Sequence, residues 1–565
     1  MSFRVHGAGH KTEWVNLLIA IPVGIIAALV TVCFRLAISA INGLMFTDGS
    51  DITKAFNEYP WITWPLVTAA GGVIAGLILQ QALRYEARHG KMPDYLDVID
   101  KRLPGIPVVS TLLRSLSSLA SIASGGSIGR EGAMVQLAAM SGSLFARFSR
   151  FTFLRQSDVI AMAAAGGLAA VYHAPFAGAL FVAEIAFGVT AVQRLIPLFI
   201  SASVAVLTVR SFFSYAPLYL YSSAVFSPSP SAMLTVLAIG AVTGMMGPLF
   251  IGAIDKVRVA MQPLRHPALR LGIGGLAVGL VAMISPLVLG NGYEVIGLIF
   301  NNGDLHHSLL LLLVLKIVAT AITVGSGAVG GLFTPSLLIG AASGALVCSL
   351  LQAMGFDPGP VGLYAAIGMS ALLAATSHAP LMSIMMAFEM TLNSSLLFPL
   401  MLATAISYMV ASRFKSSGTY PVLTRLNARF AAKNEFEQET IASLLHPCSK
   451  MYVDASLTDV VTEGLKHRNR FVYIVDRQER FLGGVPTNVL ASGLIDGSIK
   501  ASQPIAQFIE EAFTTLYQYD NYEQAWAMFS QSPLERLPVL ENAQNRRLVG
   551  VITKSALLNK AKSFL

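Results

Sequence analysis

A glycine-rich apolar segment that occurs twice limits the folds open to this chain more than any other feature. The first copy, SGGSIGREGAMVQLAAMSGSL, spans Ser124–Leu144 and contains an arginine and a glutamate. The second copy, SGAVGGLFTPSLLIGAASGAL, spans Ser326–Leu346, 202 residues later, and aligns without a gap. A second pair of blocks follows, LAAVYHAPFAGALFVAE ending at Glu184 and LAATSHAPLMSIMMAFE ending at Glu389. The chain therefore contains two related halves, each with an apolar helix that glycines interrupt.

The composition indicates that these halves lie in a membrane. Of the 565 residues, 54% are hydrophobic and only 12% are charged, whereas soluble proteins carry about 25% charged residues. Gly, Ser or Pro interrupts several of the long apolar runs, which a bilayer tolerates only where protein or a water-filled cavity satisfies the freed backbone groups. We therefore expect an all-α membrane unit over 1–424, with halves at about 14–213 and 233–412. Such halves, with a site at their interface, are typical of transport proteins.

A shorter repeat follows the membrane unit, where the composition becomes that of a soluble protein. Asp454–Thr487 aligns without a gap with Asp520–Thr553, 66 residues later. Each copy reads as an amphipathic helix, a strand, a polar turn, a second strand and a further helix. We therefore expect two small α/β modules after a charged linker. The expected boundaries are 425–446 for the linker, 447–500 for the first module and 501–565 for the second.

Basic residues flank both ends of the apolar region. Arg4 and Lys11 precede it, and Arg413 and Lys415 follow it. By the positive-inside rule, this pattern predicts that both termini are cytoplasmic. Such flanks also account for the net charge of +8, so we expect membrane lipid and no nucleic acid as a partner. The three cysteines are scattered, so we predict neither a disulfide nor a metal site.

The repeated segment has the chemistry of an anion site. Arg130–Gly132 begins a helix after the first glycine-rich break, and Leu332–Phe333 holds the matching position in the second copy. Two helix N-termini that meet would bind an anion through backbone N–H groups, without burying a full positive charge. Glu131 would occupy that site until an ion or its own protonation displaces it, which makes it a candidate gate. A local Arg130–Glu131 ion pair with close helix packing is the alternative, but it leaves the second copy unexplained.

Several motifs together resemble those of the CLC family of chloride channels and chloride/proton antiporters, and most of all its ClcB-type bacterial branch. They are GREGA at Gly129–Ala133, GGLFTP at Gly330–Pro335, HAPFAGALFVAE at His173–Glu184 and Tyr420 in SSGTYPVL. The resemblance covers about Asn16–Arg425, and the modules beyond it resemble paired CBS domains. It implies an inverted repeat of tilted, partly re-entrant helices and no enzymatic activity. It further implies a homodimer in the bacterial inner membrane, with one chloride pathway per subunit.

The resemblance also implies roles for individual residues. Glu131 matches the gating glutamate. The matching chloride ligands are backbone amides and one hydroxyl, from Arg130, Gly132, Leu332, Phe333 and Tyr420. Without these motifs Tyr420 would be interpreted as an interfacial anchor. In the family's first loop a serine hydroxyl contacts the anion, but Gly90 stands at that position and offers no side chain. Selectivity among chloride, nitrate and fluoride is therefore open, although Tyr420 argues against the fluoride-exporting branch.

Proton coupling is open for a similar reason. Many antiporters of the family carry a proton-passing glutamate directly after the position of Glu184, where this chain has Ile185. Both chloride/proton exchange, with a route past Glu184, and passive conduction remain possible interpretations. Glu184 and Glu389 have an alternative role as packing residues bonded to the opposite half. Lys316, a lone cation in an apolar run, would either pair with a carboxylate or attract anions.

The paired modules also depart from a known pattern. CBS modules that bind adenine nucleotides often place an aspartate where this chain has Leu490 and Ala556. We therefore expect no nucleotide cofactor and a dimer-stabilising role for the modules, so that chloride is the only bound ligand. A membrane-anchored sensor is a further alternative, but an anchor has no need of Glu131.

Overall fold

The computed structural model describes residues 6–45, 60, 62–90, 93–101, 103, 105–149, 155–187, 192–213, 219, 225–301, 308–414 and 440–563. The chain divides into two compact units, Met1–Thr424 and Arg425–Leu565. Tyr420, a predicted chloride ligand, lies outside the described residues.

The first unit is built from helices, and five of the helices described are long and apolar enough to cross a membrane. The elements of its first half are α1 (His6–Met45), α3 (Thr63–His89), α4 (Tyr95–Lys101), α5 (Val108–Ala123), α6 (Glu131–Phe148), α7 (Gln156–Tyr172), α8 (Pro175–Val182), the π-helical turn η1 (Ala183–Phe187) and α9 (Val192–Arg210). Those of its second half are α10 (Pro230–Met261), α11 (Pro267–Ala282), η2 (Pro286–Val288), α12 (Tyr293–Asn301), α13 (Leu309–Gly325), α14 (Phe333–Ala353), α15 (Val361–Ser377), α16 (Pro380–Thr391), η4 (Ser394–Leu396) and α17 (Leu397–Ser412).

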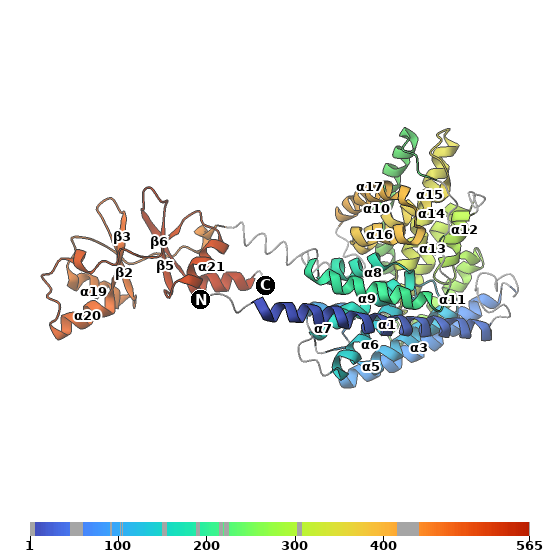
Figure 1. Cartoon of the computed structure of the whole chain (residues 1–565), viewed down its shortest axis with the longest axis horizontal. Helices are drawn as coiled ribbons and strands as arrows, with labels where there is room; N and C mark the ends of the chain where they lie inside the picture. Colours follow the sequence, from blue (N-terminus) through green and yellow to red (C-terminus); the bar gives the residue numbers. More distant parts are fainter. Residues whose placement is uncertain are drawn as a thin grey trace. The chain divides into compact units, whose positions relative to one another are not determined.

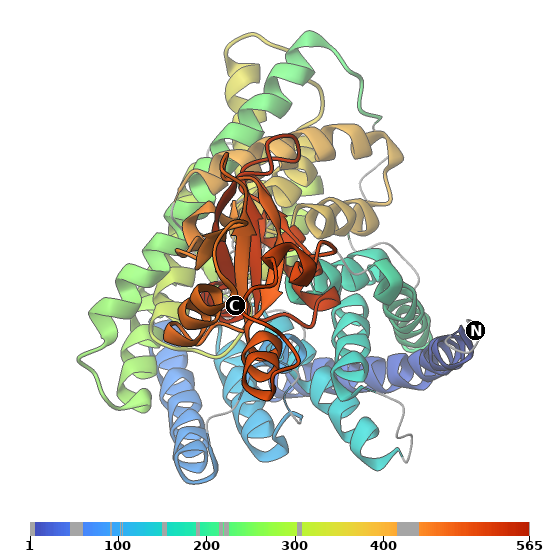
Figure 2. The same cartoon turned by 90° about the vertical axis from the view of Figure 1, so that its left-hand side faces the viewer.

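The two halves repeat the same local structure and lie against each other (Figures 1 and 2). The pair α5 and α6 matches α13 and α14, and the pair α7 and α8 matches α15 and α16. Both breaks contain a left-handed glycine, Gly125 with φ 94° and Gly327 with φ 95°, a conformation that glycine adopts without strain. His173 and His378 end α7 and α15 with φ 55° each. The sequence repeat is therefore a structural repeat.

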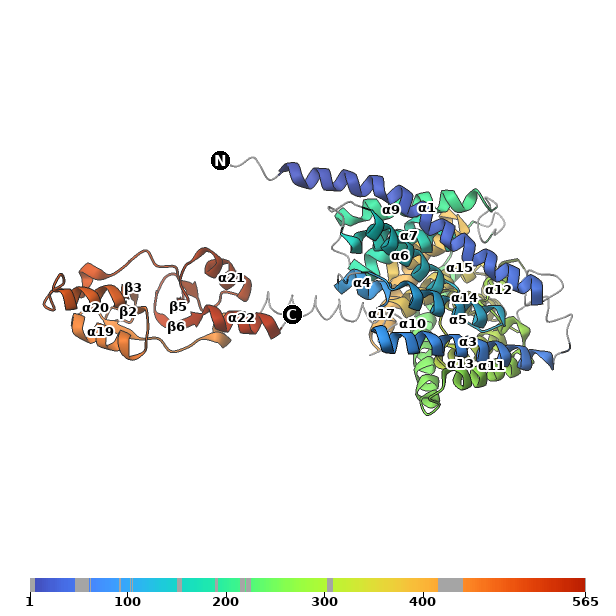
Figure 3. The same cartoon turned by 90° about the horizontal axis from the view of Figure 1, so that it is seen from below.

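Small residues let the helices of the first unit approach closely. α3 packs against α5 and α11 (Figure 3), and α14 packs against α15. At the second contact, a Cβ atom on Gly344 would overlap the backbone of Tyr364. Close backbone approach of this kind drives helix association in lipid, where apolar side chains gain little by leaving one apolar environment for another.

The second unit contains two three-stranded sheets of the same topology. In each sheet the first strand runs parallel and the third antiparallel to the central one. The strands are β1 (Lys450–Tyr452), β2 (Phe471–Val475) and β3 (Phe481–Pro486), then β4 (Leu516–Tyr517), β5 (Arg536–Leu540) and β6 (Leu548–Thr553). The helices and turns are η5 (Ile441–Leu444), α19 (Leu457–Lys466), α20 (Thr487–Asp496), η6 (Ile505–Phe508), α21 (Tyr522–Gln531) and α22 (Lys554–Ser563).

Two features of these modules differ from the sequence prediction. Each module has an additional short strand, β1 or β4, which is too short to show a period-2 pattern in sequence. The boundaries also shift, because Ile441 is buried in the core of the second module and Ile505 in that of the first. The core of the second module therefore includes a residue of the predicted linker (425–446), and the core of the first module includes a residue of the range predicted for the second (501–565).

Glu479, in the turn between β2 and β3, joins the two modules. Its carboxylate accepts hydrogen bonds from Lys450 Nζ at 2.5 Å and from Arg547 Nη2 at 2.9 Å. These hydrogen bonds, with that from Lys450 the strongest, lower the pKa of the Glu479 carboxyl. Nearby, the amide of Phe481 donates to the carbonyl of Arg546 at 2.8 Å. The modules therefore share backbone and charged contacts across their junction.

Candidate functional site

The N-termini of α6 and α14 meet at the two glycine-rich breaks. The amide of Gly129 donates to the carbonyl of Gly331, and the amide of Gly331 donates back to Gly129, both at 2.8 Å. This reciprocal pair brings the start of α6 beside the start of α14. The positive ends of two helix dipoles therefore converge on one place. The residues gathered there include the predicted set Arg130, Glu131, Gly132, Leu332 and Phe333.

The carboxylate of Glu131 lies between these two helix starts. Its side chain is buried, and its Oε1 accepts a hydrogen bond from the hydroxyl of Thr334. Among the described residues its Oε2 has no hydrogen-bond partner. A Cβ atom on Gly129 would overlap Oε2, and one on Gly331 would lie 2.8 Å from it. The matched glycines therefore make room for the carboxylate as well as for close helix packing.

Arg130 points elsewhere, so the local ion pair weighed from sequence is not formed among the described residues. The guanidinium carbon of Arg130 lies 5.7 Å from the ring centroid of Tyr293, within the range of a cation–π contact. Glu131 is thus a buried carboxylate surrounded by helix N-termini and one hydroxyl.

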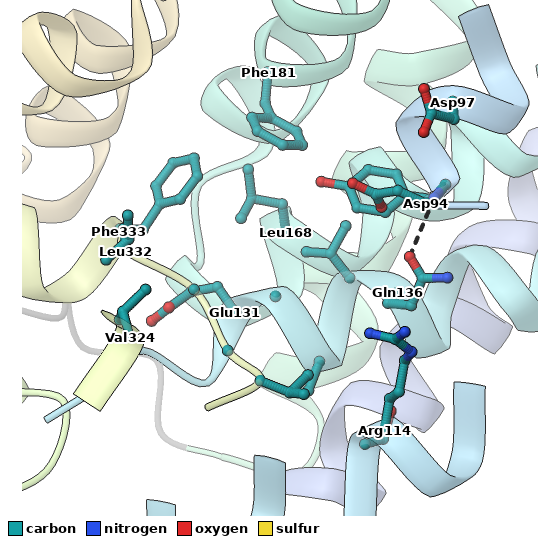
Figure 4. A pocket seen from close by; sticks show the side chains of 18 of the residues that line it. Asp94, Asp97, Arg114, Glu131, Gln136, Leu168, Phe181, Val324, Leu332 and Phe333 are labelled. Atoms are coloured by element: carbon teal, nitrogen blue, oxygen red, sulfur yellow. Dashed lines mark hydrogen bonds between the residues drawn. The ribbon is translucent and has the colours of Figure 1, made fainter. Parts of the chain in front are cut away.

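A cavity of about 550 Å³ extends from Glu131. Figure 4 shows Glu131 and Phe333 at one end of it and Asp94 and Arg114 at the other. Arg258, from α10 of the second half, also lines it. The cavity is large enough to hold many water molecules beside the buried carboxylate. Both halves of the repeat therefore enclose one polar space.

Sequence reasoning missed the charged residues of this cavity. Asp94 directly precedes α4, and Arg114, on α5, forms an ion pair with the buried Glu86 at 2.7 Å. Two signals were available in the sequence. Asp94 is a charged residue close to the Gly90 loop, and Arg114 is a lone arginine within an apolar helix. Gly90 itself ends α3 with φ 104° and is exposed. Among the described residues it does not line the cavity, although Pro93 of the same loop does.

A tyrosine hydroxyl and a group of aromatic rings lie next to Glu131, and sequence reasoning missed this arrangement as well. The hydroxyl of Tyr172 lies 2.9 Å from Thr334 Oγ1. The ring of Phe333 lies 6.3 Å from that of Tyr172 and 5.5 Å, edge to face, from that of Phe181. Both Tyr172 and Thr334 lie within the repeated blocks. The residues at the matching positions of the other half are of different types, so the repeat gave no signal for these two hydroxyls.

Two other singled-out residues serve local structure. Glu184 lies in the π-helical turn η1, and its two oxygens accept the amides of Leu381 and Met382 at 3.1 and 2.9 Å. This is the packing arrangement considered for Glu184. Lys316 is fully buried, and its Nζ donates to the carbonyls of Val288 and Gly290, both at 2.9 Å. The carboxylate pair considered for Lys316 is therefore not formed among the described residues, since its hydrogen bonds are to backbone carbonyls.

Two membrane-type helical halves that place a buried carboxylate at the end of a cavity with charged residues in its lining are typical of a membrane transport protein or channel. The sequence model of the family described as "Voltage gated chloride channel" matches residues 71–412, and that of the CBS domain matches residues 505–563. The chain belongs to this CLC family of chloride channels and transporters, with a CBS region after the membrane unit. It is accordingly a membrane protein and not an enzyme. The family resemblance and the fold class expected from sequence are confirmed.

Relatives by sequence point to the same branch. The chain is 43% identical over 425 residues to a "Putative chloride channel protein ClcB-like" of Ralstonia nicotianae. The aligned region covers 73% of this chain and 96% of the relative. It is 36% identical over 414 residues to "Voltage-gated ClC-type chloride channel ClcB" of Escherichia coli, with 72% and 97% covered.

Solved structures share the fold. A slow cyanobacterial Cl⁻/H⁺ antiporter matches with a TM-score of 0.63 at 21% identity, covering 74% of this chain and 99% of that one. A CLC-type fluoride/proton antiporter matches with a TM-score of 0.59 at 21% identity, covering 72% and 97%. A eukaryotic CLC transporter matches with a TM-score of 0.61 at 19% identity and covers 97% of this chain and 98% of that one, thus including the CBS region.

Proposed function

We propose that this protein moves chloride across the bacterial inner membrane through a pathway that Glu131 gates. The supporting observation is the buried carboxylate between the starts of α6 and α14, with Oε2 unbonded among the described residues and glycines around it. A carboxylate there occupies the place of a bound anion and is held only by partial charges, which an entering anion can replace. The proposed chloride ligands are the backbone amides of Arg130, Gly132, Leu332 and Phe333 and the hydroxyl of Tyr420.

The proposed mode is chloride/proton exchange, with Glu131 as the proton acceptor. Glu184 is an unsuitable relay because backbone amides occupy both of its oxygens. The cavity offers another route, because Asp94 and Asp97 line the same space as Glu131 and water within it can carry a proton. Passive conduction gated by Glu131 is the second candidate, and the buried Ile185 favours it because an alkyl side chain cannot carry a proton.

The proposed assembly is a homodimer with one pathway per subunit and both termini in the cytoplasm. The CBS pair would stabilise this dimer rather than bind a nucleotide. In support, Leu490 is buried in the core of the first module and Ala556 replaces the second carboxylate. The mass of the purified protein in detergent, measured by light scattering, should equal two chains.

Flux through the purified protein in liposomes tests the function and its mode together. The liposomes carry a chloride gradient and a potassium/valinomycin voltage clamp, and external pH and the reversal potential are recorded simultaneously. Uphill proton movement driven by chloride would establish exchange. Chloride flux that reverses at the chloride equilibrium potential without proton movement would establish passive conduction. Movement of fluoride in preference to chloride, or of neither, would overturn the proposal.

A further inference from the structure

We infer that Thr334 and Tyr172 form a pair of hydroxyl donors that binds the permeant anion whenever the Glu131 carboxylate leaves its site. The inference rests on the proposed function and adds side-chain ligands, and thus a source of selectivity, to a site otherwise built from backbone amides. Thr334 lies in the first turn of α14, and Tyr172 is the last residue of α7.

The hydrogen bonds of this pair have a defined direction. When Glu131 is ionised its carboxylate can only accept, so Thr334 Oγ1 donates its single proton to Glu131 Oε1. The contact between Thr334 Oγ1 and the Tyr172 hydroxyl, at 2.9 Å, then uses the Tyr172 proton, with Thr334 as acceptor. The chain of donors runs from Tyr172 to Thr334 and ends on the anionic group. Polarisation along such a chain strengthens its terminal bond.

The Thr334 and Tyr172 hydroxyls are buried, so the direction of their hydrogen bonds affects the stability of the site. Both Thr334 and Tyr172 are 1% exposed, so neither hydroxyl has bulk water as an alternative partner. Glu131 lies between Thr334 and the cavity, because Glu131 lines the cavity and also accepts the Thr334 hydrogen bond. When the carboxylate moves out, the two hydroxyls can satisfy only one donor between them, so one buried O–H is left without an acceptor, which is unfavourable. An anion that enters from the cavity removes that cost.

The neighbouring residues suit a small monovalent anion. The start of α14 adds its dipole to the same point. Phe333, whose ring lies 6.3 Å from that of Tyr172, restricts the space beside the donors. The limited space beside a single hydroxyl donor suits a monatomic anion better than the larger, planar nitrate, so the pair should favour chloride over nitrate.

The decisive experiment separates anion binding from the holding of Glu131. Chloride binding to the full chain in detergent is measured by calorimetry in a Glu131→Ala background, where the carboxylate cannot occupy the site. Adding Thr334→Val, which keeps the shape and removes the donor, should weaken chloride binding about tenfold. Thr334→Ser should restore binding, and Tyr172→Phe should give a smaller loss because it removes only the distal donor. Ser370→Ala removes a buried hydroxyl that bonds Thr404 elsewhere and should change nothing.

A liposome measurement supplies the second readout. Thr334→Val should lower the chloride-to-nitrate flux ratio, while Thr334→Ser keeps it. Equal chloride binding and an equal flux ratio with and without the Thr334 hydroxyl would overturn the inference while leaving the proposed function intact. A Glu131→Ala parent that neither binds nor conducts chloride would overturn the proposed function itself. Thermal unfolding of each variant identifies misfolded protein, in which case Thr334→Ser and Tyr172→Phe decide the outcome.

Discussion

Glu184 and Glu389 cap each other's helices. Glu184, in the turn η1 directly after α8, accepts the amides of Leu381 and Met382 in the first turn of α16. Glu389, within α16, accepts the amides of Phe176 and Ala177 in the first turn of α8, at 3.0 and 2.8 Å. A carboxylate at a helix N-terminus is favourable because it satisfies unpaired N–H groups and faces the positive end of the dipole. The two halves are thereby joined by equivalent bonds in both directions.

Replacing either capping glutamate should destabilise the membrane unit without affecting proton coupling. Glu184→Gln and Glu389→Gln each place an amide group against backbone N–H donors, so we expect losses of about 1–3 kcal/mol and of similar size. Thermal unfolding in detergent measures the loss, and the liposome assay measures coupling. Loss of proton movement in Glu184→Gln alone, with Glu389→Gln as the matched control, would mean that Glu184 carries protons.

Removing the proposed gate should separate chloride movement from proton movement. In Glu131→Ala the site lacks its carboxylate, so chloride flux should persist while proton coupling and the dependence of flux on pH disappear. Flux is measured with a simultaneous pH record from about pH 4, near the ordinary pKa of a glutamate, to about pH 8, which the most strongly raised carboxyl pKa values in proteins approach. Glu294→Ala, which removes an exposed carboxylate of α12, serves as the control and should behave as wild type. Coupling retained in Glu131→Ala would remove Glu131 from this role.

The glycines around the carboxylate provide a steric test of the same site. In Gly129→Ala the new methyl group overlaps Glu131 Oε2, so the carboxylate should be expelled and flux should lose its pH dependence. Gly297→Ala is the matched control, since a Cβ atom on this α12 glycine would meet nothing within 4 Å. Combining Gly129→Ala with Glu131→Ala should add little to the effect of Glu131→Ala on flux. An unchanged dependence of flux on pH in Gly129→Ala would contradict the packing described around the Glu131 carboxylate.

The junction of the two CBS modules should weaken at acidic pH. Because the pKa of Glu479 is lowered in the folded protein, its contribution is complete above its ordinary value of 4.5 and is lost as the pH falls through the lowered value. Glu479→Gln should therefore increase hydrogen exchange of the Phe481 amide at pH 7, where its hydrogen bond to Arg546 should protect it in the wild type. Asp454→Asn breaks the surface pair with Arg477 inside the first module and should leave that amide protected. Equal protection in both variants would show that Glu479 does not hold the junction.

Local pattern predicted some elements well. The glycine-rich breaks end α5 and α13 where the repeat placed them, because glycine permits the left-handed turn that each break contains. The apolar runs predict strands at Phe471–Asp476 and Leu537–Glu541, within one residue of β2 and β5 at each end, because four consecutive positions of each strand are buried. Long-range packing was less accessible to pattern, since Ile441, predicted in the linker, packs in the core of the second module and Ile505, predicted in the second module, packs in that of the first.

The sequence by itself determined the membrane class, the two-fold repeat and the residues at the meeting helix ends. Composition, repeats and motif spacing can all be read along the chain without knowing its folded form. Tertiary structure alone decided which polar groups meet. Tyr172 and Thr334 are 162 residues apart, and Thr334 and Glu131 are 203 apart, so no local pattern could pair them. The same holds for Lys316, whose partners are backbone carbonyls rather than a carboxylate. A hydrogen bond depends on where two atoms lie after folding, and the chain between them is too long for spacing to specify that position.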